Sequence, residues 1–117
     1  MCKLHVFALV LLLASGCKPE TSIDDYPCPK EGTKLTYESF GRNFLGKNCQ
    51  ICHGQPTSDR KGAPEGFDFG TLEAVRDKKS RIFARAAAGN ATMPPGPDKP
   101  PAADGEKLGE WLACGAP

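Results

Sequence analysis

Several residue types are scarce in this chain of 117 residues, which contains two histidines, two methionines and one tryptophan. β-Branched residues are few beside 13 glycines and 11 prolines. This composition argues against a sheet-rich core and favours short helices joined by irregular loops. The sequence therefore predicts an all-α fold with little or no sheet, in one small domain that needs additional stabilisation.

An excess of charge of either sign is also missing. Fifteen basic residues face 14 acidic ones, so a strongly basic face of the kind that binds nucleic acid is not expected. The sequence shows no pairing of a nucleophile with a general base either. We therefore expect neither a nucleic-acid partner nor an enzyme.

The chain has no apolar run long enough to span a bilayer. The run from Val6 to Ala14 has nine residues, whereas a spanning helix needs about 20. Lys3 precedes this run and small residues follow it, which is typical of a signal peptide over residues 1–16. The sequence Leu13-Ala14-Ser15-Gly16-Cys17 resembles a bacterial lipobox, which implies cleavage before Cys17 and acylation of that cysteine. An ordinary secretory signal ending in a chance cysteine is the alternative.

Residues 17–34 carry prolines, acidic residues and few apolar ones, so we expect a lipid-anchored tether there and a folded domain over residues 35–117. Acylation by two or more chains is enough for stable anchoring. The protein would then face the periplasm of a bacterial cell envelope. Lys18, where an acidic residue often signals retention in the inner membrane, slightly favours the outer membrane.

The strongest motif is Cys49-Gln50-Ile51-Cys52-His53. It offers two thiols one helical turn apart, followed at once by an imidazole, which suits covalent attachment of a haem. A thioredoxin-like redox pair would need a βαβ setting, and a zinc site would need four ligands, for which no second Cys/His pair is present. A disulfide-rich envelope protein without haem would leave the order of the motif unexplained.

The motif resembles the attachment site of c-type cytochromes, in which Cys49 and Cys52 would become thioethers and His53 the proximal iron ligand. Two short helical patterns follow it, then Gly89-Asn90-Ala91-Thr92-Met93-Pro94, then a last helix with a tryptophan. This order is similar to that of small bacterial class I monohaem cytochromes over residues 36–114. The resemblance implies a class I cytochrome c-like fold, with four or so short helices around one haem c.

Met93 is the expected second axial ligand, because a thioether opposite histidine favours ferrous iron. Once residues 1–16 are removed, His53 is the only histidine and Met93 the only methionine, so bis-histidine ligation within the chain is excluded. The alternative is a loop methionine beside a site that is open, water-bound or lysine-bound. In class I cytochromes a proline carbonyl fixes the ligating histidine ring, and Pro64 matches that proline by position, although it also fits a simple turn.

Two cysteines remain after the signal peptide, the lipid and the haem have accounted for four of the six. These are Cys28 and Cys114. In an oxidising compartment two such thiols are expected to form a disulfide, which would join the end of the tether to the last helix. Two separate thiols are the alternative, because pairing depends on the distance between the Cα atoms.

Four helices are expected. The first begins at Thr36 as its N-cap and ends near Asn48, with Gly41 on its apolar face where another helix would approach closely. The remaining three are Leu72 to Lys78 capped by Thr71, Arg81 to Ala88 capped by Ser80 and ended by Gly89, and a last helix from Pro101 to Cys114 that contains Trp111.

Together these features predict a monomeric electron carrier that moves one electron at a time between a redox-protein donor and acceptor in the envelope. Arg60, Arg81 and Arg85 could neutralise haem propionates, and the sequence does not rank them. A haem-based gas sensor and a peroxidase-like haem-enzyme subunit are the alternatives. Both require a sixth iron ligand that can leave.

Overall fold

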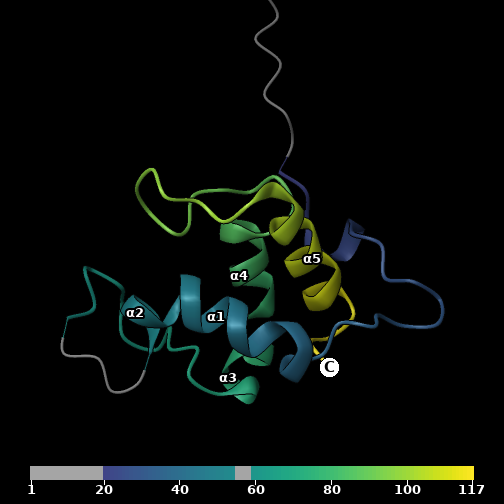
Figure 1. The fold of residues 1–117 in the computed structure, drawn as a ribbon, viewed down its shortest axis with the longest axis horizontal. Coiled ribbons are helices and arrows are strands. Elements are labelled where there is room, and N and C mark those ends of the chain that lie inside the picture. Colours follow the sequence, from purple (N-terminus) through teal and green to yellow (C-terminus); the bar gives the residue numbers. More distant parts are fainter. Residues whose placement is uncertain (1–19, 55–58) are drawn as a thin grey trace, which may run out of the picture.

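A computed structural model describes residues 20–54 and 59–117, and over these residues the chain forms helices and loops without any strand. The all-α prediction is thus confirmed for the described part. The predicted signal peptide (1–16) and the predicted acylation site Cys17 lie outside it. No described helix is long and apolar enough to cross a membrane. The elements, drawn in Figure 1, are a short 3-10 helix, η1 (Ile23–Asp25), a π-helical turn, η2 (Tyr37–Gly41), and the α-helices α1 (Arg42–Asn48), α2 (Gln50–His53), α3 (Leu72–Asp77), α4 (Lys79–Ala86) and α5 (Ala102–Ala113).

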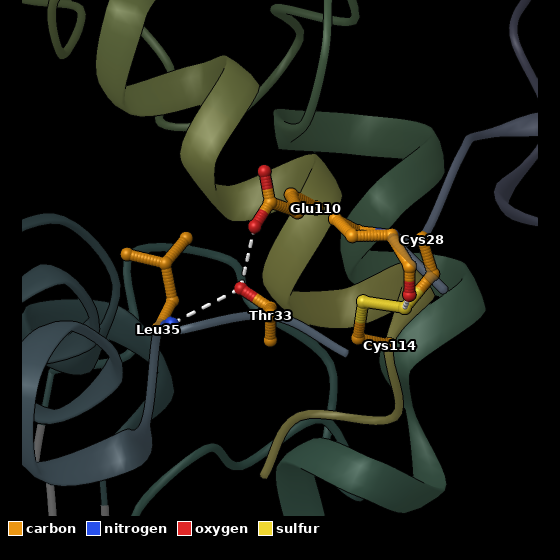
Figure 2. The surroundings of a disulfide bond; sticks show 6 residues. Cys28, Thr33, Leu35, Glu110 and Cys114 are labelled. Atoms are coloured by element: carbon orange, nitrogen blue, oxygen red, sulfur yellow. Dashed lines mark hydrogen bonds between the residues drawn. A yellow bond between two sulfur atoms is a disulfide. The ribbon is translucent and has the colours of Figure 1, made fainter. Parts of the chain in front are cut away.

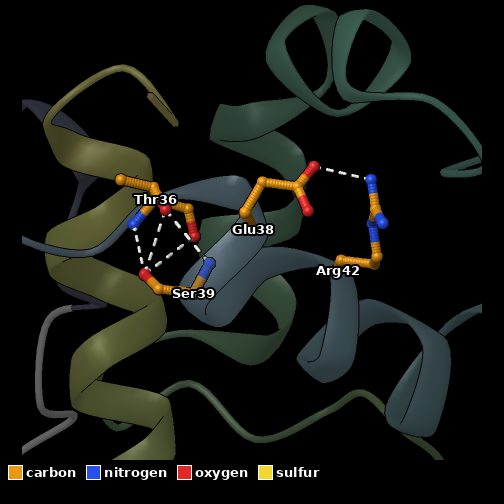
Figure 3. Close-up of polar contacts among 4 residues, drawn as sticks. All are labelled: Thr36, Glu38, Ser39 and Arg42. Atoms are coloured by element: carbon orange, nitrogen blue, oxygen red, sulfur yellow. Dashed lines mark hydrogen bonds and ion pairs between the residues drawn. The ribbon is translucent and has the colours of Figure 1, made fainter.

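The predicted first helix is present as η2 followed without a break by α1. Its N-terminus is a capping box (Figure 3): Ser39 N donates to Thr36 Oγ1 at 3.0 Å, and Thr36 N donates to Ser39 Oγ at 2.9 Å. Glu38 and Arg42 add an exposed ion pair of 2.6 Å between successive turns. The helix ends at Asn48, so Cys49 sits at the junction with α2.

The helix η2–α1 crosses α5 at Gly41. A Cβ atom at Gly41 would lie only 2.5 Å from Cζ2 of Trp111, whose side chain is fully buried. The Trp111 ring is held in place because Nε1 donates to the carbonyl oxygen of Pro117 at 3.1 Å. The close approach expected from Gly41 is therefore confirmed, and only glycine fits there.

One hydrophobic core lies between these crossing helices and α4. Phe44, Leu45, Phe83, Leu108 and Trp111 are among its large side chains, and all are buried. Phe40 adds an edge-on contact with Trp111 at 6.1 Å between ring centroids. Burial of each such side chain contributes about 2 kcal/mol, so this core is the main stabilising element of the helix arrangement.

The middle helices differ from the prediction in part. Thr71 caps α3 as expected, accepting from Ala74 N at 3.2 Å. However, Ser80 lies inside α4, which begins at Lys79 directly after the α3 C-cap, and it caps nothing. The end of α4 was also predicted wrongly: Ala88, with φ of 52°, takes the left-handed conformation expected of Gly89. The cause is packing, because Ala88 is buried and its N–H donates to Gly105 O at the start of α5.

The segment before the first helix is not the free tether that the sequence suggested. Residues 21–34, here called the N-terminal strap, contact α5 at several points: through η1, Tyr26, Cys28 and Thr33. The Tyr26 ring fills the notch left by Gly109, where a Cβ would lie 3.0 Å from the ring, and meets Phe83 edge-on at 5.4 Å. The Tyr26 hydroxyl donates to the Glu106 carboxylate at 2.5 Å. The packed domain therefore begins near residue 21, not at residue 35.

The predicted disulfide between Cys28 and Cys114 is present, with 5.2 Å between the Cα atoms, and fastens the strap to the end of α5 (Figure 2). Beside it, Thr33 Oγ1 donates to Glu110 Oε1 at 2.5 Å and accepts from Leu35 N at 3.0 Å. Because the disulfide closes a loop of 86 residues, restriction of the unfolded chain contributes about 4 kcal/mol.

Gly41→Ala is expected to lower the free energy of unfolding by about 2 kcal/mol, because the new methyl group has no room beside the Trp111 ring. Gly46→Ala is the matched control on the exposed side of α1. A Cβ there meets nothing closer than 3.9 Å, so this variant should gain about 0.5–1 kcal/mol from helix propensity. Urea unfolding followed by circular dichroism measures both. Equal effects of the two substitutions would contradict the tight helix crossing.

Tyr26→Phe is expected to weaken the strap only below the pH at which Tyr26 ionises. Burial, and then the hydrogen bond to Glu106, raise the pKa of Tyr26 from 10.0 to about 12. The stabilisation is thus fully present below pH 10 and is lost as the pH rises from 10 to 12. Wild type should exceed the variant by about 1 kcal/mol at about pH 8 and should lose that advantage by about pH 12. Unfolding curves of both proteins at several pH values test this, and a pH-independent difference would contradict it.

Candidate functional site

A cavity of about 420 Å³ opens between α2, the loop that follows it, α4 and the loop that follows α4. This volume lies in the range of small-molecule and cofactor sites. Most of the lining surface is apolar. The lining side chains are those of Cys49, Cys52, His53, Arg60, Lys61, Ala63, Pro64, Phe67, Phe69, Arg81, Ile82, Arg85, Ala86, Met93, Pro94 and Pro95. The cavity thus gathers residues from four separate stretches, including every predicted haem ligand.

The two cysteines of the motif lie on one wall, at the junction of α1 and α2. Cys49 N donates to Leu45 O at 2.8 Å, and His53 N donates to Cys49 O at 2.9 Å, so helical bonding continues through the motif. Neither Cys49 nor Cys52 is in a disulfide. Burial, and then the neighbouring Cys52, raise the pKa of the Cys49 thiol to about 12. A catalytic redox pair requires a lowered pKa, so the thioredoxin-like alternative loses support.

The His53 ring is held in a fixed orientation on the same wall. Its Nδ1 lies 2.6 Å from the carbonyl oxygen of Phe67, and the ring stacks on Phe69 at 4.7 Å between centroids. A carbonyl can only accept, so this contact assigns the proton to Nδ1 and leaves the lone pair on Nε2. An imidazole prepared in this way is suited to bind a metal ion through Nε2.

The prediction that the Pro64 carbonyl holds the His53 ring was wrong. A backbone carbonyl does hold the ring, but it belongs to Phe67. The Pro64 carbonyl accepts instead from Arg60 Nη2 at 2.8 Å and from Phe67 N at 3.4 Å. The Pro64 turn therefore influences the His53 ring only indirectly. It positions Phe67, whose carbonyl contacts His53. No sequence signal distinguishes Phe67, since the atom that matters belongs to the backbone.

Met93 lines the cavity from the loop after α4. Its N–H donates to the carbonyl oxygen of Arg85 at 2.9 Å, and Thr92 Oγ1 donates to the same oxygen at 3.2 Å. The end of α4 therefore fixes the backbone of Met93, while its side chain remains 40% exposed. The structure thus brings His53 and Met93, 40 residues apart in sequence, to one cavity.

The structure also separates the three arginines that the sequence could not rank. Arg60 binds residues of its own loop: it forms an ion pair of 2.5 Å with Asp68 and donates hydrogen bonds to Ala63 O and Pro64 O. Arg81 and Arg85, one turn apart on α4, line the cavity and form no ion pair within the described residues. These two are therefore the lining cations best able to pair with an acidic group in the cavity.

Within residues 20–54 and 59–117, no group of three His, Cys, Asp or Glu side chains is placed to hold a metal ion. The zinc alternative therefore gains no support from this part of the chain.

Asp68→Asn should destabilise the cavity wall, because the Arg60–Asp68 pair is largely buried, with the two side chains only 23% and 18% exposed. Loss of one partner of such a pair costs about 2 kcal/mol. Asp59→Asn is the control, since the side chains of the Lys61–Asp59 pair are 58% and 70% exposed and a solvent-exposed pair contributes little to stability. Thermal unfolding of the two variants separates these outcomes, and a harmless Asp68→Asn would show that the pair does not hold the wall.

Comparison with known proteins identifies no relative: no family model, no curated protein and no solved structure matches this chain.

Proposed function

We propose that this chain is a monohaem c-type cytochrome that transfers one electron at a time in a bacterial cell envelope. The observation that carries the proposal is the apolar cavity that contains Cys49, Cys52, His53 and Met93 together. Within the described residues, this cavity brings two thiols, an imidazole and a thioether around one space.

The residues present fit a covalently held haem. Cys49 and Cys52 form no disulfide and line an apolar cavity, where they would hold the group as thioethers. His53 has its Nε2 lone pair available, and Phe67 O keeps the ring oriented and raises the basicity of Nε2. Haem c would supply the one-electron chemistry when bound. Arg81 and Arg85 would offset the negative charge of its acidic groups.

Electron transfer is favoured over substrate turnover because the cavity offers two side chains that could hold a haem iron, His53 and Met93. His53 would supply a nitrogen and Met93 a sulfur, and a thioether ligand would favour the reduced state of the iron. The walls of the cavity that contains both residues are mostly apolar. The side chain of Met93 is exposed, and a ligand in such a position could leave the iron. The gas-sensor and haem-enzyme alternatives both need a ligand that leaves, so they remain to be tested.

The helix arrangement supports the class I cytochrome c-like fold as part of the proposal. In that fold the first and last helices pack across each other, and η2–α1 and α5 do so at Gly41 and Trp111. The disulfide between Cys28 and Cys114 supports an oxidising compartment. Together with the lipobox-like residues 13–17, it supports a periplasm-facing, lipid-anchored protein.

Absorption spectra of the protein produced in a cell envelope with haem-attachment machinery test the function. We expect sharp c-type bands after reduction, a weak far-red band from the Met93–iron bond after oxidation, and no change when carbon monoxide is added to the reduced form. Met93→Ala should abolish the far-red band and bind carbon monoxide. A wild-type protein that binds carbon monoxide strongly would favour sensing or catalysis, and a protein without haem would refute the proposal.

A matched pair of cysteine variants identifies the attachment residues. Cys49→Ser and Cys52→Ser should each abolish one thioether and shift the reduced bands, because one vinyl group then remains free. The double variant Cys28→Ser/Cys114→Ser also removes two sulfur atoms, but these form the disulfide between the strap and the end of α5, so it should lose stability and keep the wild-type spectrum. Haem attachment that survives loss of both Cys49 and Cys52 would contradict the assignment.

A further inference from the structure

We infer that the protein rests directly on a lipid surface, with the loop after α4 facing the headgroups. This inference rests on one component of the proposed function, the acylation of Cys17. The surface consists of residues 88–97, which contain Met93, together with the first residues of the N-terminal strap.

The strap fixes where the chain leaves the folded body. Asn90 Nδ2 donates to the carbonyl oxygen of Thr21 at 3.4 Å and to that of Phe83 at 3.1 Å, so one side chain joins the start of the strap to α4. From there on, η1 packs against α4 and α5, the Tyr26 hydroxyl is bound to Glu106, and Cys28 is linked to Cys114. The body therefore begins at Thr21, beside the loop that carries Met93.

The remaining tether is too short to let the body move away from its anchor. Three residues lie between Cys17 and Thr21, and the four Cα–Cα steps from Cys17 to Thr21 span at most about 14 Å when fully extended. A tether ending at Leu35 would have reached about 60 Å. A domain of this size has a radius of gyration of about 12 Å, so the extended tether is only about as long as that radius. The point at which the chain leaves the folded body must therefore stay close to the bilayer. The face around Thr21 and Asn90 is therefore the one that meets the lipid.

The chemistry of this face suits lipid headgroups. Residues 86–97 contain no charged side chain of their own, and Ala91, Thr92 and Pro95 are exposed there. The ammonium group of Lys99 donates to the carbonyl oxygen of Pro94 in this loop. Asp24 and Asp25 are exposed on η1 nearby. Because these carboxylates would be repelled by anionic lipids, the face fits a zwitterionic surface.

The opposite end of the molecule is formed by α3 and the C-terminus. Figure 1 shows the described chain beginning next to the loop between α4 and α5, while α3 lies at the far end of α4. α3 carries Glu73, Arg76 and Asp77 on exposed positions. A body held by Thr21 thus directs this charged end away from the bilayer.

Paramagnetic relaxation measured by NMR tests the orientation. The lipidated, reduced, nitrogen-15-labelled protein is placed in phosphatidylcholine nanodiscs whose headgroups carry gadolinium, and identical discs carrying lanthanum provide the reference. We expect the largest relaxation enhancement at the amides of residues 21–25 and 88–97, and a several-fold smaller one along α3. Uniform enhancement over the surface, or a maximum at α3 or at residues 59–67, would overturn the inference.

Two controls distinguish a body held against the bilayer from a loosely tethered or dimeric protein. A variant with a 12-residue Gly/Ser insertion between Lys18 and Pro19 keeps the same folded body, and its enhancement should become weaker and more uniform. A wild-type protein whose mass shows no acyl group on Cys17 would overturn the inference, as would a dimer with residues 88–97 shielded from gadolinium. Because the gadolinium–lanthanum difference does not require haem, its failure is distinguishable from failure of the absorption spectra.

Discussion

The contact between Gly41 and Trp111 is the constraint on which the remaining structure depends. The indole ring occupies the space where any side chain at Gly41 would lie, so the first and last helices can cross only at this residue. The crossing fixes the direction of α1, and α1 ends where the cysteine motif begins. A contact in the core, well away from the cavity, therefore decides where the two thiols and His53 are presented.

The strap complements this crossing from the other side of α5. Tyr26 enters the notch at Gly109 in the way that Trp111 covers Gly41, so α5 is clamped by two aromatic–glycine contacts. The hydroxyl–carboxylate bond to Glu106 fastens the strap within this helix, and the disulfide fastens it at the C-terminal end. A small domain gains stability in this way without a larger core, which agrees with its length.

The sequence predicted those features that depend on local or compositional rules. The capping residues Thr36 and Thr71, the all-α content, the disulfide and the glycine at the helix crossing all have a local signature. The predictions from the sequence were wrong at positions where tertiary packing overrides such local signatures. Ala88 takes the conformation expected of Gly89 because α5 buries it and bonds its N–H. The strap was mistaken for a tether because few of its residues, chiefly Tyr26 and Cys28, make the contacts that fold it.

The candidate site shows why ligand types are easier to predict than their supports. Both expected ligands are positioned by backbone carbonyls: Phe67 O holds the ring of His53, and Arg85 O holds the backbone of Met93. A carbonyl is present at every residue, so its use leaves no mark in the sequence. What selects Phe67 over Pro64 is the course of the loop, which Arg60 sets by binding the Pro64 carbonyl and Asp68. The histidine is therefore oriented by a chain of contacts that starts at an ion pair, and a substitution at Asp68 can disturb His53 without contacting it.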